Sequence, residues 1–234
     1  MLMALACAPA APTPVVPALP LAPGVLAVAA GDTWAYLLLG PERAAWVDTG
    51  SDPSGRAVLA ALAAAGRTPA QVEAIVLTHG HRQQWAATHL FPAATLHMGA
   101  ADRPWVQGQA HPRAAWARLQ HRLAPARPLP QEPLPVLPGS RLVLAGQSWE
   151  AVALPGHTLG SLALVRDGLA LVGDALVCRG GRAELPSRWL SEWPAGRAQA
   201  VVRLRPYGPL RLGCSDGGVS MPDSAAWAAL MQVP

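Results

Sequence analysis

The most constraining feature of the sequence is an apolar run that ends in two histidines. Residues 74–77 are Ala-Ile-Val-Leu, a pattern typical of a strand buried in a sheet. His79 and His81 follow at the point where this strand should end. Histidines one residue apart leave the backbone close together, so their imidazole nitrogens can converge on one metal ion. A single His-x-His pair is a weak signal, and its value depends on the rest of the chain.

The length and composition are those of one large folded domain. The chain has 234 residues, 51% of them hydrophobic and 14% charged, so a substantial core can form and general disorder is excluded. The net charge is +4, but the basic residues are all arginines and are scattered, without interleaved aromatics. This pattern argues against nucleic-acid binding. No proline-free apolar run is long enough to span a bilayer, so we expect no integral membrane segment.

The N-terminal stretch differs from the rest. Residues 1–17 contain no charged side chain and several prolines, which prevent a continuous helix, so we predict a flexible segment followed by one domain over residues 18–234. Residues 4–7, Ala-Leu-Ala-Cys, faintly resemble the lipid-attachment box of bacterial lipoproteins, without its positive region and longer apolar core. We expect a cytoplasmic protein. Export or lipid anchoring through Cys7 is the alternative, if the true start lies upstream.

Cysteines are sparse and odd in number. Cys7, Cys178 and Cys214 predict no disulfide framework, and no pair has the Cys-x-x-Cys spacing of a zinc or redox motif. A buried structural role for Cys214 is therefore favoured over a reactive one.

The pattern of apolar runs and turn residues predicts a chain of short strands with a few helices between them. The expected strands are residues 25–28, 33–39, 45–48, 74–77, 94–97, 142–144, 150–154, 162–165, 169–172 and 210–212. The expected helices are residues 54–65, a short one from Pro69, 83–90, 113–122 and 191–204.

Further polar motifs stand at the ends of these strands. Asp48-Thr49-Gly50 ends the strand at 45–48, and His157 lies in a glycine-bracketed turn at 155–161. Gly173-Asp174 follows the hairpin at 162–172. In this order and spacing, the motifs resemble the metallo-β-lactamase superfamily of hydrolases over about residues 18–220. The resemblance implies an α/β (α+β) fold, a four-layer αββα sandwich of two mixed sheets with helices outside. The turn at 156–161 is most similar to the glyoxalase II and lactonase branch, although fold alone does not fix the substrate.

The resemblance also implies a metal site in the loops at one edge of the sheets. Matched to the family's pattern, His79, His81 and His157 are ligands of a first zinc ion. Asp174 matches the aspartate that bridges the two zinc ions of the family. Asp48 matches a residue that ties loops together beneath the site and does not bind metal.

The second metal site of the family is degenerate in this sequence. Gln83 and Gln84 stand where the family has an aspartate and a histidine, and Cys214 stands where a terminal histidine is usual. An amide is a poor ligand beside carboxylate or imidazole. Cys214, Asp174 and the nearby Asp216 are the remaining candidates, so we expect one zinc ion, or another divalent metal, and no second ion.

We therefore predict a mononuclear hydrolase of a small-molecule substrate. Three imidazoles with an open fourth position lower the pKa of a metal-bound water towards ~7, and the hydroxide attacks an ester, lactone, thioester or amide carbonyl. Asp174 completes the coordination or orients the water. Because the family's positioning carboxylate is replaced by Gln83, the rate on usual substrates should fall by about 10²–10⁴-fold.

Two alternatives follow from the same substitutions. The first is a catalytically degenerate fold member that acts as a binding or scaffold protein. The second is a hydrolase rebuilt around a Cys214 thiolate, as ligand or nucleophile. A scaffold has no need of three imidazoles that converge with an aspartate, and this favours the hydrolase.

Overall fold

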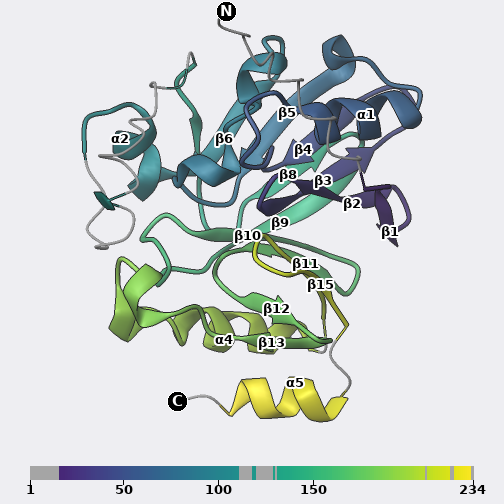
Figure 1. The fold of residues 1–234 in the computed structure, drawn as a ribbon. Helices are drawn as coiled ribbons and strands as arrows, with labels where there is room; N and C mark the ends of the chain where they lie inside the picture. Colours follow the sequence, from purple (N-terminus) through teal and green to yellow (C-terminus); the bar gives the residue numbers. More distant parts are fainter. Residues whose placement is uncertain are drawn as a thin grey trace, which may run out of the picture.

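A computed structural model describes residues 16–110, 118–119, 129, 131–208, 210–221 and 224–232. Two sheets pack face to face, with helices on the outer side of each (Figure 1). The first sheet is antiparallel from β1 to β4 and parallel from β4 to β7. Its strands, in spatial order, are β1 (Leu19–Ala22), β2 (Val25–Ala30), β3 (Thr33–Leu39), β4 (Ala44–Val47), β5 (Val72–Leu77), β6 (Thr95–Gly99) and β7 (Leu134–Val136).

The second sheet has the strand order β15-β14-β11-β10-β9-β8. Only β11 and β14 pair in parallel. Its strands are β8 (Arg141–Leu144), β9 (Gln147–Ala153), β10 (Leu162–Arg166), β11 (Leu169–Gly173), β14 (Arg211–Cys214) and β15 (Gly218–Ser220). A separate two-stranded ribbon is formed by β12 (Val177–Arg179) and β13 (Arg182–Glu184).

The helices are short. The α-helices are α1 (Arg56–Ala64), α2 (Arg103–Val106), α4 (Gln199–Leu204) and α5 (Ser224–Met231). The 3-10 turns are η1 (Pro69–Gln71), η2 (Arg82–Gln84), η3 (Thr88–Leu90), η4 (Ala100–Asp102), η5 (Arg188–Leu190), η6 (Pro194–Gly196) and η7 (Arg205–Tyr207). Within the described part of the chain, no helix has the length and apolar character that a membrane-spanning segment needs.

The period-two pattern of the strands divides the core into layers. On β4, Trp46 faces the cluster under α1, whereas Val47 faces the layer between the sheets. On β11, Leu171 faces that same middle layer and Val172 the cluster under α4 and α5. Three apolar layers thus separate four layers of secondary structure, and the predicted αββα sandwich is confirmed.

Two helix predictions are corrected. Residues 83–90 form two 3-10 turns, η2 and η3, in place of one helix. Residues 191–204 form η6 and the shorter α4, because Pro194 lacks the N–H that a helix interior requires. The predicted helix at 113–122 lies outside the described residues except for 118–119, and so do residues 1–15. The proposed division of the chain at residue 17 stays a prediction.

The cysteine prediction was wrong. Cys178 and Cys214 form a disulfide with a Cα–Cα distance of 5.8 Å. They lie 36 residues apart in sequence, but β12 runs beside the end of β14, where the Cys178 amide donates to the Asp216 carbonyl at 3.0 Å. Both side chains are buried in the cluster under α4 and α5. Only the tertiary fold brings them together, so no spacing rule could have paired them.

Candidate metal site

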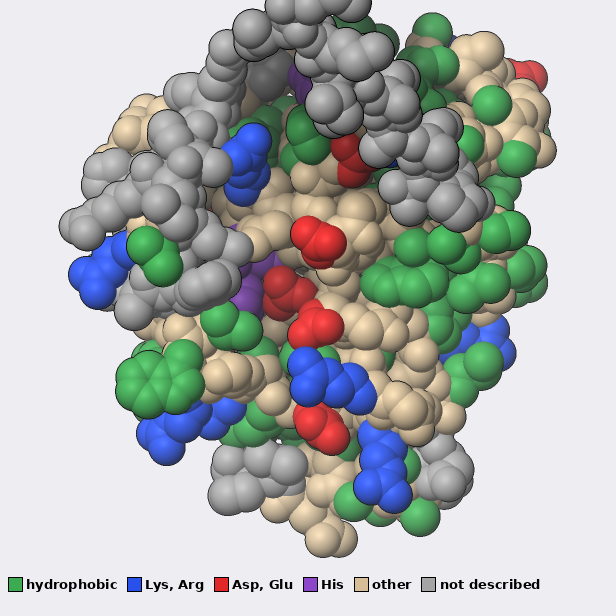
Figure 2. Space-filling view, in the orientation of Figure 1, with side chains coloured by type: hydrophobic (Ala, Val, Ile, Leu, Met, Phe, Trp, Pro, Cys, Tyr) green, Lys and Arg blue, Asp and Glu red, His purple; other side chains and the backbone are tan. Residues whose placement is uncertain are grey.

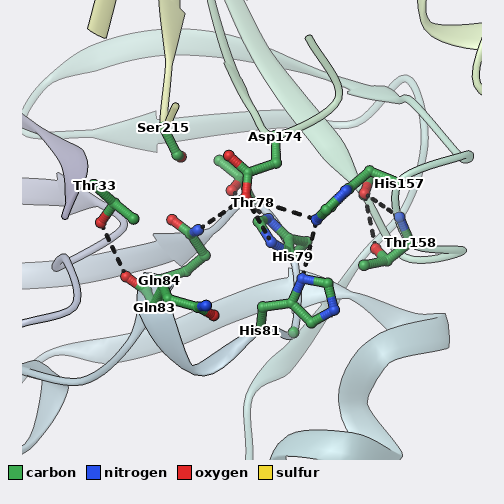
Figure 3. Close-up of polar contacts among 12 residues, drawn as sticks. Thr33, Thr78, His79, His81, Gln83, Gln84, His157, Thr158, Asp174 and Ser215 are labelled. Carbon is green, nitrogen blue, oxygen red and sulfur yellow. Dashed lines mark hydrogen bonds and ion pairs between the residues drawn. The ribbon is translucent and has the colours of Figure 1, made fainter. Parts of the chain in front are cut away.

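Strand ends from both sheets meet at one edge of the sandwich. The first sheet supplies His79 and His81 directly after β5. The second supplies Asp174 after β11, and the loop between β9 and β10 supplies His157. The carboxyl ends of parallel strands lie at the same edge of a sheet, which is where open α/β sheets place their sites. Figure 3 shows the four side chains pointing toward one another.

The three histidines form one compact cluster. Their potential ligand nitrogens all lie within 4.8 Å of one another. Nδ1 of His81 is 3.0 Å from Nε2 of His157. The ring centroids are 4.7 to 4.9 Å apart and the rings are nearly perpendicular, at 85° to 88°. Nitrogen lone pairs therefore converge on one region, and this cluster could hold a metal ion.

Asp174 adds a carboxylate to the same region. Its Oδ2 is 3.4 Å from Nε2 of His79 and 3.6 Å from Nε2 of His157. Its side chain is 21% exposed, so the carboxylate lies at the open side of the cluster. In the space-filling view, histidine and acidic side chains reach the surface next to each other on this face (Figure 2). Burial raises the pKa of Asp174 to about 6.

The protonation state of the histidines fits a metal ligand set. Burial, followed by the neighbouring imidazoles, lowers the pKa of His79 and of His157 well below the usual value. Both rings are therefore neutral and offer lone pairs. Nε2 of His79 is buried and has no hydrogen-bond partner in the described residues. A metal ion would satisfy that nitrogen, so the residues present fit one.

Comparison with known proteins identifies the family. The family model described as "Metallo-beta-lactamase superfamily" matches residues 28–207, most of the chain. The chain belongs to this superfamily. No curated protein matches the sequence at a significant level.

Solved structures of the superfamily share the fold. A metallo-beta-lactamase family protein from Thermus thermophilus, TTHA1429, has a TM-score of 0.68 and 23% identity, over 91% of this chain and 79% of that chain. A Cronobacter sakazakii metallo-beta-lactamase described by a HARLDQ motif has a TM-score of 0.65 and 18% identity, over 93% of this chain and 90% of that chain. TTHA1623, in a di-iron-bound form, has a TM-score of 0.63 and 23% identity, over 89% of this chain and 94% of that chain. At these identities the similarity establishes the fold only.

Uncharged glutamines stand at the two positions where the resemblance implies ligands of a second metal. Gln84 is buried, and its Nε2 donates to Oδ2 of Asp174 at 3.4 Å. Its backbone oxygen accepts from the Thr49 amide at 2.6 Å, which fixes the segment. The backbone oxygen of Gln83 accepts from the Thr33 hydroxyl at 3.2 Å. An amide N–H therefore faces the Asp174 carboxylate.

The expectation of a Cys214 thiolate is wrong, whereas Asp216 as a pocket residue stays a prediction. The Cys214 sulfur is bonded to Cys178, so no thiolate is present to act as ligand or nucleophile. The side chain of Asp216 is 52% exposed and pairs with Arg179 at 3.4 Å. Ser215, between them, is the one that turns inward, with its Oγ 3.3 Å from Oδ2 of Asp48. Ser215 directly follows β14, and its amide donates to the carbonyl of Gly173 at 2.9 Å, which holds the serine next to the end of β11.

Asp48 ties the strand ends together from below. It is fully buried, and its carboxylate accepts from the amide of Thr78 at 2.8 Å and from its hydroxyl at 2.7 Å. Asp48 adopts a left-handed conformation with φ of 58°, which aspartate tolerates better than most residues. Since Thr78 precedes His79, these bonds fix where the first histidine leaves β5.

Asp102 is a site residue that the sequence analysis missed. It is fully buried, and its carboxylate accepts from the amides of Gly80 at 2.9 Å and Gly160 at 2.8 Å, and from the Thr158 hydroxyl at 2.6 Å. Gly160 must lack a Cβ, which would lie 2.5 Å from the Asp102 carboxyl carbon. Asp102 thereby links the loop of His79 and His81 to the loop of His157. It lies outside any motif, so no local signal could have identified it.

The burial of Asp48 leads to a pH prediction for metal-free protein. Burial raises its folded-state pKa from 3.8 to about 7, so its contribution to stability is complete below the unfolded value and is lost as pH rises through 7. Asp48→Asn removes this loss. Between about pH 5 and pH 8, the unfolding free energy of the variant should rise relative to wild type by about 2 kcal/mol.

Urea unfolding of both chelator-treated proteins over this pH range measures the difference. Asp32→Asn, at an exposed position, is the control and should follow the wild-type profile. Parallel profiles for Asp48→Asn and wild type would contradict the assignment.

Proposed function

We propose that the protein is a hydrolase that holds one divalent metal ion, most simply zinc, on His79, His81 and His157. The observation that carries this proposal is the convergence of three imidazoles beside Asp174, with Nε2 of His79 among the buried nitrogens that have no hydrogen-bond partner in the described residues. When bound, the ion supplies a Lewis acid and a water of lowered pKa. The substrate class is a small molecule with an ester, lactone, thioester or amide carbonyl.

Asp174 is the residue we assign to the chemistry. Its Oδ2 lies between two of the ligand histidines, so it can complete the ligand set or accept a hydrogen bond from the attacking water. Gln84 holds this carboxylate in place through its amide. The glyoxalase II- or lactonase-like substrate suggested by the turn around His157 stays a prediction.

A single metal is supported by two uncharged side chains that contact the carboxylates of Asp174 and Asp48. Gln84 donates a hydrogen bond to Asp174, and Ser215 contacts Asp48. Neither side chain carries a charge, and neither is a strong ligand. The HARLDQ motif of the Cronobacter sakazakii metallo-beta-lactamase also ends in glutamine, as does the segment from His79 to Gln84 when the two are aligned at their first histidine. A glutamine at this position is therefore compatible with a hydrolase.

We also infer that the protein works in an oxidising compartment. The buried disulfide between Cys178 and Cys214 supports this, because structural disulfides are rare in the cytosol. It favours export over the cytoplasmic location expected from the sequence.

The first prediction concerns metal content. Wild-type protein purified from zinc-supplemented medium should carry about one equivalent of zinc, and His157→Ala should lose most of it because two imidazoles are a weak set. Elemental analysis measures this. His89→Ala, at an exposed position, is the matched control and should retain the metal. Metal-free wild-type protein would contradict the hydrolase proposal and favour the alternative of a binding or scaffold protein.

The second prediction concerns turnover. Asp174→Asn should lower kcat on any accepted substrate by about 10²-fold or more, since the carboxylate is replaced by a neutral group. A panel of lactones, thioesters and β-lactams, tested with equal metal loading of both proteins, gives the comparison. Equal kcat values would remove Asp174 from the mechanism.

The third prediction concerns the two glutamines. If they exclude the second metal, the double variant Gln83→Asp with Gln84→His should raise zinc content from about one to about two equivalents. The same elemental analysis serves, with Gln83→Asn as a control that adds no ligand. Zinc content that stays at the wild-type level would show that these glutamines are not what excludes the second ion.

A further inference from the structure

The two ring nitrogens of His81 have different surroundings. Nδ1 faces the cluster, 3.0 Å from Nε2 of His157. Nε2 points the other way, away from Asp174 and Gln84 (Figure 3). It is buried and makes no hydrogen bond within the described residues. The Glu192 carboxylate lies next to this nitrogen, with its Oε1 3.9 Å from Nε2 of His81.

Glu192 is held in this position by the backbone. Its amide donates to the carbonyl of His157 at 2.7 Å, and the amide of Trp193 donates to the carbonyl of Gly156 at 3.0 Å. The segment between η5 and η6 is thus bonded directly to the loop that carries the third histidine. The Glu192 side chain is only 1% exposed. A carboxylate is therefore buried behind one ligand histidine while its backbone is bonded to another.

The ring of His81 has little freedom to change this arrangement. Trp105 stacks on it with a centroid distance of 5.9 Å and an interplanar angle of 19°. Trp105 covers one face of the ring and His157 lies beside Nδ1, so the tautomer is the property that decides which nitrogen offers its lone pair to the cluster. A neutral imidazole carries one N–H, and only the Nε2–H form leaves a lone pair on Nδ1 to face the cluster. A carboxylate on the Nε2 side favours that form, because it attracts the N–H dipole.

We propose that Glu192 is a positioning residue for the metal site: it keeps His81 in the Nε2–H tautomer, so that Nδ1 is ready to bind the ion. The 3.9 Å separation is longer than a hydrogen bond, so the attraction across it is electrostatic in this structure. The role lies outside the ligand set and outside every motif in the sequence. It rests on the proposed metal-binding function, because a tautomer matters only if Nδ1 has an ion to bind.

Zinc affinity provides the first test. Glu192→Gln is nearly isosteric and removes the charge, and it should raise the zinc dissociation constant about 10–100-fold, as for other carboxylates behind a ligand histidine. Competition with a chromophoric chelator measures this constant. Glu184→Gln, at an exposed position on β13, is the matched control and should bind zinc like wild type. Glu192→Asp keeps the charge and should recover part of the loss.

The tautomer itself provides the second test, which a purely structural role would not affect. In metal-free protein labelled with ¹⁵N-histidine, long-range proton–nitrogen spectra should show His81 as the Nε2–H form in wild type and in Glu184→Gln. The Nδ1–H form should gain population in Glu192→Gln. If that variant does not fold, the wild-type spectrum decides: an Nδ1–H tautomer of His81 overturns the proposal.

The outcomes separate this inference from the proposed function. Wild-type protein that binds no zinc contradicts the metal site as a whole. Wild-type protein that binds zinc, with an unchanged dissociation constant in Glu192→Gln, contradicts only the role of Glu192.

Discussion

The candidate metal site depends on the apolar layer shared by the two sheets. One sheet carries His79 and His81, and the other carries Asp174. Their approach is set by large side chains buried between the sheets, among them Tyr36 and Trp149. Burial of each such side chain stabilises the sandwich by about 1.5–3 kcal/mol. The Tyr36 hydroxyl also donates to the carbonyl of Cys214 at 2.7 Å, which joins β3 to the end of β14.

Two buried carboxylates fix the loops that follow the packed strands. Asp48 fixes the end of β5, and Asp102 bonds the His-Gly-His turn to the loop of His157. Burial raises the pKa of both groups, and hydrogen bonds from backbone amides and hydroxyls oppose that shift. The histidines are thus held together by groups that do not themselves belong to the ligand set. Such support is what a metal site requires in order to be rigid before the ion binds.

The part of the site next to Gln84 and Ser215 is built from neutral groups. The Gln84 amide faces Asp174, the Ser215 hydroxyl faces Asp48, and Cys214 is committed to a disulfide. These features are consistent with one another, because the carboxylates of Asp174 and Asp48 each accept a hydrogen bond from a neutral donor. They support our proposal of a single metal ion, which Asp174 would serve together with the three histidines.

The sequence by itself determined most strands of the two sheets, the order of the motifs, the superfamily and the three histidines. Alternating apolar residues and polar strand ends are local patterns, and they can be recognised in the sequence without any distance between residues in space. Tertiary structure decided which side chains support the site, namely Ser215, Asp102 and Glu192, whereas Cys214 faces the core on the other side of its sheet. It also paired Cys178 with Cys214. These contacts join residues distant in the chain and depend on strand alternation and loop approach, so no spacing along the sequence encodes them.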